Sequence, residues 1–386
     1  MRRTVFLGLA LALLGIGIAI VLIVGPAEPS HQGKPLSFWL EEIDDNQPET
    51  RRDEARKAIR AIGTNAIPQL IADFRLDEPK WKRVLMQWMM KQSVIKVKYR
   101  TGDTRSSAAT WAFQALGATA RPAIPELVRL LDQNPGYVPA ALAGIGVDAV
   151  PALVNALTHT NRHVRANAGG ALANAVSRGG IPRAVPVAAI PLWLEQLKDN
   201  DANLRYYAAW GLGTLREHPE LCIPALMRSL DDPVASVQTA SAKSLQDFGP
   251  LAVEAVPKLT NLFTSPDPNV RYIVAGALGA IGDSSAVPIL ASGVRDPSDV
   301  VRIWTVGALG SIGRESQISV PALIAALKDP NDMVRLKAAE SLRPFGKDAA
   351  GAVEALREMA ENDPDKRARN MAAQSLRFIS PDSTPK

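Results

Sequence analysis

Cysteine, histidine and aromatic residues are scarce in this chain of 386 residues. The single cysteine, Cys222, excludes an internal disulfide, a CxxC redox pair and any cysteine-based zinc or iron–sulfur site. Four histidines leave little material for metal binding or acid–base catalysis. Aromatic residues make up 5% of the chain while hydrophobic residues make up 47%, so the core must be built mainly from Ala, Leu, Ile and Val.

Signals of catalysis and of nucleic acid binding are weak as well. The net charge of +5, from 44 basic and 39 acidic residues, is too small to indicate a nucleic-acid-binding protein. The chain has no phosphate-binding loop, no dinucleotide fingerprint and no Ser-His-Asp set at an informative spacing. His159 and His163 are four residues apart, but a predicted turn separates them. We therefore predict no catalytic residue, no metal and no cofactor, and we expect Cys222 to be a buried, inert thiol.

The first 27 residues are typical of a membrane signal anchor. Two arginines precede an uncharged apolar run from Val5 to Val24, which is 20 residues long and would span a bilayer core as a helix. The positive-inside rule places the short N-terminus in the cytoplasm and the rest of the chain on the other side. We predict a single-pass protein of the inner membrane with its array in the periplasm; secretion after signal cleavage is the alternative.

The many prolines, 29 in all, recur in register. An apolar pair ending in proline is followed each time by a leucine-rich stretch, and the last four steps between these prolines are 33, 33, 31 and 33 residues. Because proline fits the first turn of a helix, we expect these prolines to start helices. They are Pro68, Pro125, Pro151, Pro191, Pro224, Pro257, Pro288 and Pro321.

A second periodic series precedes each proline. An arginine such as Arg271, Arg302 or Arg335 follows a cluster of turn and capping residues. Eleven residues after each of these arginines comes a glycine that suits the left-handed end of a helix: Gly282, Gly313 and Gly346. Apolar residues between them fall at helical spacings. Each unit is thus predicted to be a helix A, a short turn and a helix B, which must stack on its neighbours to bury its apolar face. We interpret the arginines as a structural ladder that pairs with turn aspartates, for example Asp332 near Arg335, rather than as a binding groove.

These motifs, D-x-x-V-R, then A-x-x-x-L-G-x-I-G, then A-V/I-P-x-L, resemble the HEAT repeat family, and more closely the short HEAT-like repeats of phycobilisome lyases. The resemblance covers roughly residues 48–380. It implies an all-α fold: an α-solenoid, or armadillo-like superhelix, of about ten HEAT-like helix pairs preceded by one N-terminal transmembrane helix. Enzymatic relatives include bilin lyases and the iron-dependent deoxyhypusine hydroxylase, but no histidine here is followed by the glutamate that the iron site needs.

The predicted domain organisation has four parts. Residues 1–27 form the anchor, and residues 28–47 form a linker with a short docking helix that Ser37 caps. The repeat array covers 48–380 with an insertion at 76–105, and residues 381–386 form a disordered tail. Within the array, Ser106 and Gln238 replace the repeated arginine.

The insertion is the candidate binding site, because it breaks the repeat with a chemical bias. Residues 79–105 carry eight basic residues against one acid. Lysine and arginine side chains combined with Trp and Met are typical of an interface with a protein partner or with anionic lipid headgroups. The alternative is that the insertion is an extra packed helix that has no binding function. The candidate partner-binding residues are Lys80, Trp81, Lys82, Arg83, Trp88, Lys91, Lys96, Lys98 and Arg100.

Taken together, these features predict a membrane-anchored, non-enzymatic scaffold for protein–protein interaction. We expect a protein partner, contact with the membrane through the N-terminal helix, and no nucleic acid. The exposed positions of the B helices are expected to contribute to binding beside the insertion. The alternative is a HEAT-type enzyme, similar to a bilin lyase or to an iron-dependent hydroxylase.

Overall fold

The computed structural model of the chain describes residues 28–44, 46–75 and 100–380. The chain divides into two compact units, which are described separately: unit 1 ends at Leu153 and unit 2 begins at Val154. The predicted membrane anchor at 1–27 and the predicted disordered tail at 381–386 lie outside the described residues. None of the helices within the described ranges is long and apolar enough to cross a membrane.

Unit 1 begins with a small hairpin and continues with paired helices. Strands β1 (Ser30–His31) and β2 (Lys34–Pro35) pair antiparallel ahead of helix α2, which packs on α3. Helix α2 begins at Leu36 with Pro35 as its N-cap, so Ser37 does not cap it as predicted; the Ser37 backbone N–H instead donates to a carboxylate oxygen of Glu28. The helices are α2 (Leu36–Glu42), α3 (Glu49–Ile62), α4 (Ile67–Ala72), α6 (Gly102–Leu116), α7 (Ile124–Arg129) and α8 (Val138–Ile145). The boundary between the units falls within α9 (Val150–Ala156).

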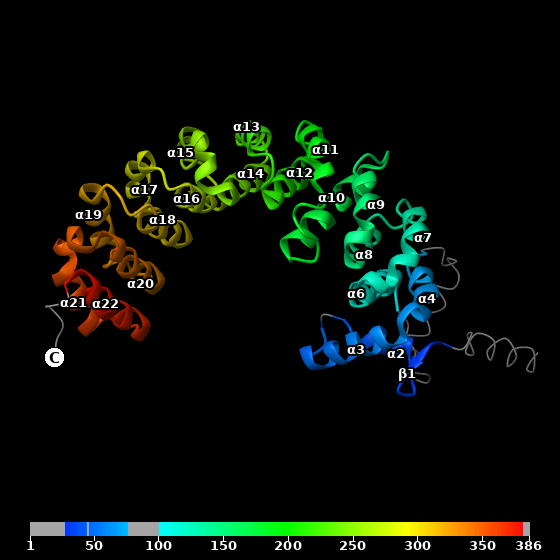
Figure 1. Ribbon diagram of the computed structural model, residues 1–386. Helices are drawn as coiled ribbons and strands as arrows, with labels where there is room; N and C mark the ends of the chain where they lie inside the picture. The colour runs from blue at the N-terminus through cyan, green and yellow to red at the C-terminus, as the bar shows by residue number, and fades with distance from the viewer. Residues whose placement is uncertain (1–27, 45, 76–99, 381–386) are drawn as a thin grey trace, which may run out of the picture. The chain divides into compact units, whose positions relative to one another are not determined.

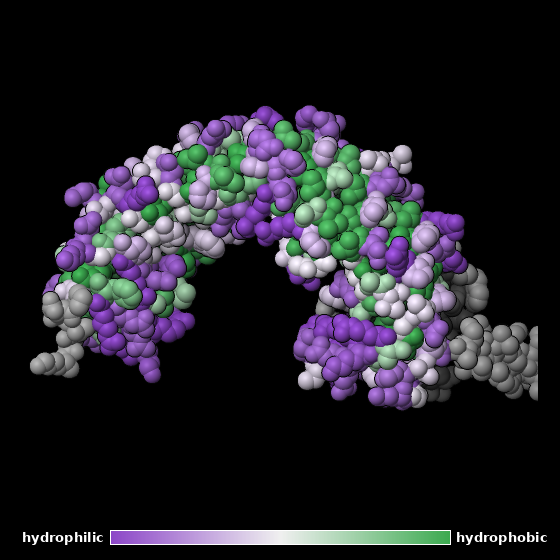
Figure 2. Space-filling model, in the orientation of Figure 1, coloured by the Kyte–Doolittle hydropathy of each residue, from purple (hydrophilic) through white to green (hydrophobic). Residues whose placement is uncertain are grey.

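Unit 2 consists of two rows of helices (Figure 1). The A helices form the inner row of its curve: α10 (Arg162–Ser177), α12 (Ala202–Leu215), α14 (Ala235–Phe248), α16 (Pro268–Ile281), α18 (Asp299–Ile312), α20 (Asp332–Ser341) and α22 (Lys366–Ile379). The B helices form the outer row: α11 (Ile190–Gln196), α13 (Pro219–Ser229), α15 (Val256–Leu262), α17 (Val287–Gly293), α19 (Ser316–Ala326) and α21 (Val353–Asn362). Figure 2 shows hydrophobic residues between the rows and hydrophilic residues along the outer row.

Small residues set the distance between neighbouring A helices. A β-carbon on Gly213 would lie 2.5 Å from the Cα of Ser244, and one on Gly279 would lie 2.8 Å from the Cα of Ala308. The buried core is otherwise Ala, Val, Leu and Ile, with Trp193 as its largest fully buried side chain. The prediction of thin aliphatic layers between stacked pairs is therefore confirmed.

Most of the repeated prolines begin helices as predicted, but two do not. In α13 and α19 the turn before the proline is already α-helical, so Pro224 and Pro321 lie inside the helix. Both helices start early after a residue with a left-handed backbone, His218 and Glu315 respectively. The other prolines occupy the second helical position, typically after a short 3₁₀ turn, where the missing N–H removes no helical hydrogen bond.

The arginine ladder is confirmed, with a correction to one of its partners. Arg302 donates from Nη1 to the carbonyl of Asp296 in its own turn and forms a bidentate pair with Asp329 of the next turn, at 2.7 and 2.9 Å. Arg335 pairs in the same way with Asp363, not with the adjacent Asp332 as predicted. The equivalent rungs are Arg165–Asp199, Arg205–Asp232 and Arg271–Asp296. Each rung thus joins consecutive repeats across a half-buried edge.

Two joints depart from this ladder. In unit 1, the Ser106 hydroxyl donates to the Asp73 carbonyl at 3.1 Å and accepts from Asn134 Nδ2 at 2.9 Å, which makes a neutral rung. In unit 2, Gln238 donates to the Asp232 carbonyl of its own turn, and the next turn offers Ser265 where other repeats have aspartate. The joint between α14 and α16 therefore has no rung.

Candidate functional site

The predicted binding insertion lies almost entirely outside the described residues. Of the nine candidates only Arg100 is described; the others, Lys80 to Lys98, fall in residues 76–99. Arg100 is half-buried, and burial lowers its pKa while the Asp73 carboxylate beside it acts in the opposite direction. Helix α6 begins at Gly102, so the last four residues of the predicted insertion belong to a regular A helix. The role of the insertion stays a prediction.

Asp73 lies where the chain leaves the first repeat for this segment. It is 8% exposed, and its Oδ2 has no hydrogen-bond partner among the residues that the structure describes. Burial raises the pKa of the Asp73 carboxyl to about 6, and Arg100 and Arg105 oppose that shift. This buried carboxyl is the most perturbed acid of unit 1, and sequence analysis did not identify it.

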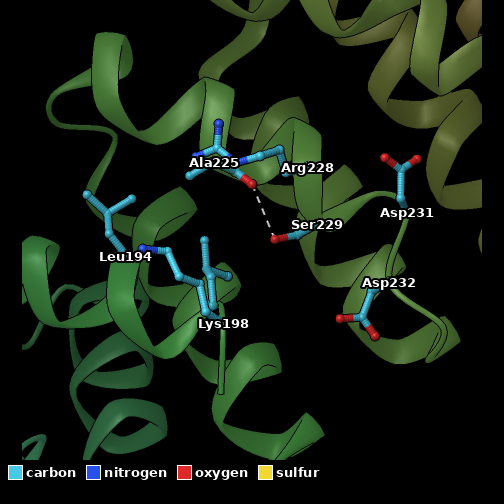
Figure 3. A pocket seen from close by; sticks show the side chains of 8 residues that line it. Leu194, Lys198, Ala225, Arg228, Ser229, Asp231 and Asp232 are labelled. Carbon is cyan, nitrogen blue, oxygen red and sulfur yellow. Dashed lines mark hydrogen bonds between the residues drawn. The ribbon is translucent and has the colours of Figure 1, made fainter. Parts of the chain in front are cut away.

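A pocket of about 240 Å³ lies between the B helices α11 and α13 (Figure 3). Both of its carboxylates are already engaged, since Asp232 pairs with Arg205 and Asp231 with Lys258, and Lys198 pairs with Glu195. A similar pocket of about 350 Å³ lies between α19 and α21 over the Arg335–Asp363 rung. Because such crevices recur with the repeat, we regard them as consequences of helix stacking.

The described residues bring together no group of three or more His, Cys, Asp or Glu that could hold a metal ion. The His159 Nδ1 atom accepts the backbone N–H of Asn161 and is thereby used by its own turn. The Cys222 thiol is buried as predicted; it donates to the Glu217 carbonyl, and burial, with a smaller contribution from Glu220, raises its pKa to about 11. This thiol is protonated at neutral pH and is a poor nucleophile.

The inner row of unit 2 carries a surface that sequence analysis did not single out. Its A helices carry exposed or half-buried aromatic residues one, two or five places after the ladder arginine. We call this set the aromatic strip: Tyr206, Tyr207 and Trp210 on α12, Tyr272 on α16, and Trp304 on α18. Trp304 is 43% exposed, which is unusual for tryptophan. In a chain with 5% aromatic residues, the grouping of these five close behind the ladder arginines is a sequence signal, although their positions differ from helix to helix.

Ring contacts and glycines hold the strip in place. Tyr206 lies 5.1 Å from Tyr207, and Tyr272 lies 6.0 Å from Trp304, between ring centroids. The Tyr207 ring lies over Gly170 of the preceding A helix, where a β-carbon would come within 2.7 Å of it. Trp304 lies over Gly276 in the same manner, at 3.1 Å. The rings are therefore fixed by packing on one side and open on the other.

Comparison with known proteins supports the repeat assignment. A family model described as HEAT repeats matches residues 190–264, 250–310 and 291–377. The chain is 32% identical over 101 residues to the phycocyanobilin lyase subunit alpha of Nostoc sp., and 35% identical over 94 residues to that of Picosynechococcus sp.. These matches cover 24% and 22% of this chain and 36% and 34% of the relatives. The chain thus spans about a third of the length of the curated relatives it matches.

Solved structures resemble the chain in fold. An engineered protein superposes with a TM-score of 0.51 at 20% identity, covering 89% of this chain and 98% of its own. Kap95p, from a complex with RanGDP, superposes with a TM-score of 0.51 at 15% identity, covering 90% of this chain and 55% of its own. The fold is therefore an all-α, HEAT-like repeat solenoid, as predicted.

Proposed function

We propose that this protein is a non-enzymatic scaffold that binds a protein partner along its repeats. The observation that carries the proposal is the aromatic strip, because exposed tryptophan and tyrosine are enriched at protein interfaces. The phycocyanobilin lyase relatives and Kap95p add support: the former are subunits by name, and Kap95p binds RanGDP. An α-solenoid suits this role because stacked repeats create an extended face.

The proposal includes a membrane location. The apolar run within residues 1–27 would anchor the chain in the inner membrane with the repeats on the periplasmic side. Protease treatment of intact and of permeabilised spheroplasts tests this topology. Digestion in intact spheroplasts supports a periplasmic array, and protection until the membrane is permeabilised contradicts it.

Crosslinking in native membranes followed by mass spectrometry tests the scaffold function. We expect one partner to crosslink reproducibly to the full chain and to be lost in the Trp304→Ala variant. Phe378→Ala is the matched control, because Phe378 is 67% exposed and lies outside the aromatic strip. The scaffold function is wrong if no partner depends on any surface of the repeats.

The basic insertion is a second part of the proposed binding surface. Deletion of residues 79–99, which keeps helix α6 and its N-cap Thr101, should weaken partner binding or liposome binding in a variant that remains folded. Anionic and neutral liposomes separate a lipid contact from a protein contact. If the deletion variant binds the protein partner and the liposomes as tightly as the full chain does, the insertion is not part of the binding surface.

A lyase-like activity is the second candidate, and the curated relatives are the observation that favours it. The test is to add phycocyanobilin to the purified full chain and to record the absorbance spectrum of the pigment. A red-shifted band at stoichiometric protein would support bilin handling. A spectrum equal to that of free pigment would leave the scaffold function as the better account.

A further inference from the structure

The charges on the face around the aromatic strip are few and mostly paired with one another. Lys243 and Asp247 on α14 form an ion pair at 3.3 Å, and Lys337 of α20, whose side chain lies over Gly307 of α18, pairs with Glu340 at 2.9 Å. Asp299 is exposed at the first position of α18 and accepts a hydrogen bond from Asn331. The chain as a whole is 22% charged. Because both lysines are paired with neighbouring carboxylates, the described part of this face presents no cluster of one charge sign, which argues against acidic or basic peptides and anionic surfaces.

The strip offers ring faces together with unused hydrogen-bond donors. Within the described part of the chain, the hydroxyl groups of Tyr206, Tyr207 and Tyr272 show no hydrogen bond, although all three residues are half-buried. Between the two ring clusters, α14 has the small residues Thr239, half-buried, and Ala240, buried, beside the Lys243–Asp247 pair. It therefore projects less far from the face than the aromatic helices on either side. A ligand that lies across these helices would meet flat apolar rings and donors for its backbone carbonyls.

The spacing of the helices matches one backbone conformation. Neighbouring packed helices lie about 8–10 Å apart, and a polyproline II helix repeats every three residues at about 3.1 Å per residue, or about 9 Å. Prolines placed at every third residue would therefore meet successive A helices. Polyproline II also leaves its carbonyls free to accept from tyrosine hydroxyls, and its preformed backbone lowers the entropy lost on binding.

We infer that the aromatic strip binds an uncharged, proline-rich segment of a partner in the polyproline II conformation, with proline at every third residue. This inference rests on the proposed scaffold function and names the class of partner. Prolines stack on Trp210 and Trp304, and the residues between them contact the small side chains of α14. The segment runs across the A helices rather than along one of them.

Titration of the purified full chain with synthetic peptides tests the inference. The probe is a peptide of about fifteen residues built from Pro-Ala-Gln repeats. Its control has the same composition, with the prolines moved so that no two are three residues apart. Fluorescence anisotropy of the labelled peptide should give saturable binding, with the control about tenfold weaker or more.

Variants locate the site. Trp304→Ala should weaken binding about tenfold because it removes one stacking ring, whereas Phe378→Ala should leave binding unchanged. Tyr272→Phe removes only a hydroxyl and should weaken binding by a smaller factor, and equal thermal unfolding shows that the variants are folded. Equal binding of both peptides, tighter binding of a Lys- or Glu-containing version, or no effect of Trp304→Ala would overturn the inference. If the peptides fail but Trp304→Ala still loses a crosslinked partner, the scaffold function stands and that partner is a folded surface.

Discussion

The same joint between consecutive repeats is built from different chemistry in the two units. In unit 2 the rung is an ion pair, as in Arg302–Asp329, whose side chains are 13% and 8% exposed. In unit 1 the rung is the neutral Ser106–Asn134 hydrogen bond, and both residues are buried. Among the described residues, the α14–α16 joint has neither an ion pair nor a neutral hydrogen bond of this kind. The difference teaches that stacked repeats can be joined by a charged bridge or by a neutral one, and that a joint without either still packs.

A second contrast follows from the first. The ladder edge of unit 2 repeats the same residues with the same contacts, whereas the aromatic strip on its inner row changes from helix to helix. Residues that repeat with the architecture serve the stacking of helices. Residues that vary on an exposed face, as Trp304 does, are free to serve recognition.

The largest expected effect comes from breaking a charged rung. Arg302→Ala leaves the Asp329 carboxylate nearly buried without its bidentate partner, so we expect a loss of about 3 kcal/mol in the free energy of unfolding. Arg295→Ala is the control, because Arg295 is exposed and has no ion pair within the described residues. Urea unfolding at pH 7 measures both. A loss equal to that of the control would show that the rungs contribute nothing.

The neutral rung should cost less to break. Ser106→Ala leaves the Asn134 amide buried at 4% exposure without its best acceptor, and we expect a loss of about 2 kcal/mol. Hydrogen exchange of the α4 and α6 amides reports the change within unit 1. Added salt should leave this loss unchanged, since no charge is involved. A salt-dependent loss would contradict the comparison.

The two units should respond to acid in opposite directions. The folded-state pKa of Asp73 is raised to about 6, so its charged form opposes folding at pH 7, and that cost disappears as the pH falls from about 6 towards 4. Arg335 holds the pKa of Asp363 below its usual range. The stabilisation from that rung is present above pH 4 and is lost as the pH falls below it.

Asp73→Asn isolates the first of these effects. We expect a gain in the stability of unit 1 of about 1–2 kcal/mol at pH 7 that vanishes near pH 4. Hydrogen exchange at the two pH values measures it, and Glu54→Gln, an exposed carboxylate of α3, is the control. A gain that persists at pH 4 would show that size or hydrogen bonding, rather than charge, is responsible.

The regular parts of the fold were predictable from sequence because they repeat. The arginine series was predicted correctly, and Gly282 and Gly313 end their helices in the left-handed conformation as predicted. Gly346 does not, because α20 already ends at Ser341 and Gly346 lies in the 3₁₀ segment that follows, with ψ at −124°. The partner of Arg335 was assigned wrongly because the nearest acid in sequence is three residues away, whereas the bond spans 28 residues. Side-chain reach across a turn, not closeness along the chain, decides the pair.

The irregular parts were harder for the same reason. Ser106 was recognised only as a departure from the repeat, although Asn134 follows it by the 28 residues that also separate Arg335 from its partner. Partner binding was predicted at the insertion and at exposed positions of the B helices, whereas the aromatic strip lies on A helices. Which face of an A helix is open depends on the packing of three neighbours, and the repeat pattern alone does not contain it.

The smallest expected effect comes from completing the ladder where it is missing. In the double variant Gln238→Arg with Ser265→Asp, the guanidinium can keep the bond to the Asp232 carbonyl and add a bidentate pair across the α14–α16 joint. We expect a gain of about 1 kcal/mol, because the pair is half-buried and must lose side-chain freedom to form. Gln238→Arg alone is the control and should gain less, since the next turn then offers only a hydroxyl. If the double variant gains no more than the single one, this joint holds its neighbours at a geometry that a rung cannot bridge, and the α14–α16 joint differs from the others in shape as well as in chemistry.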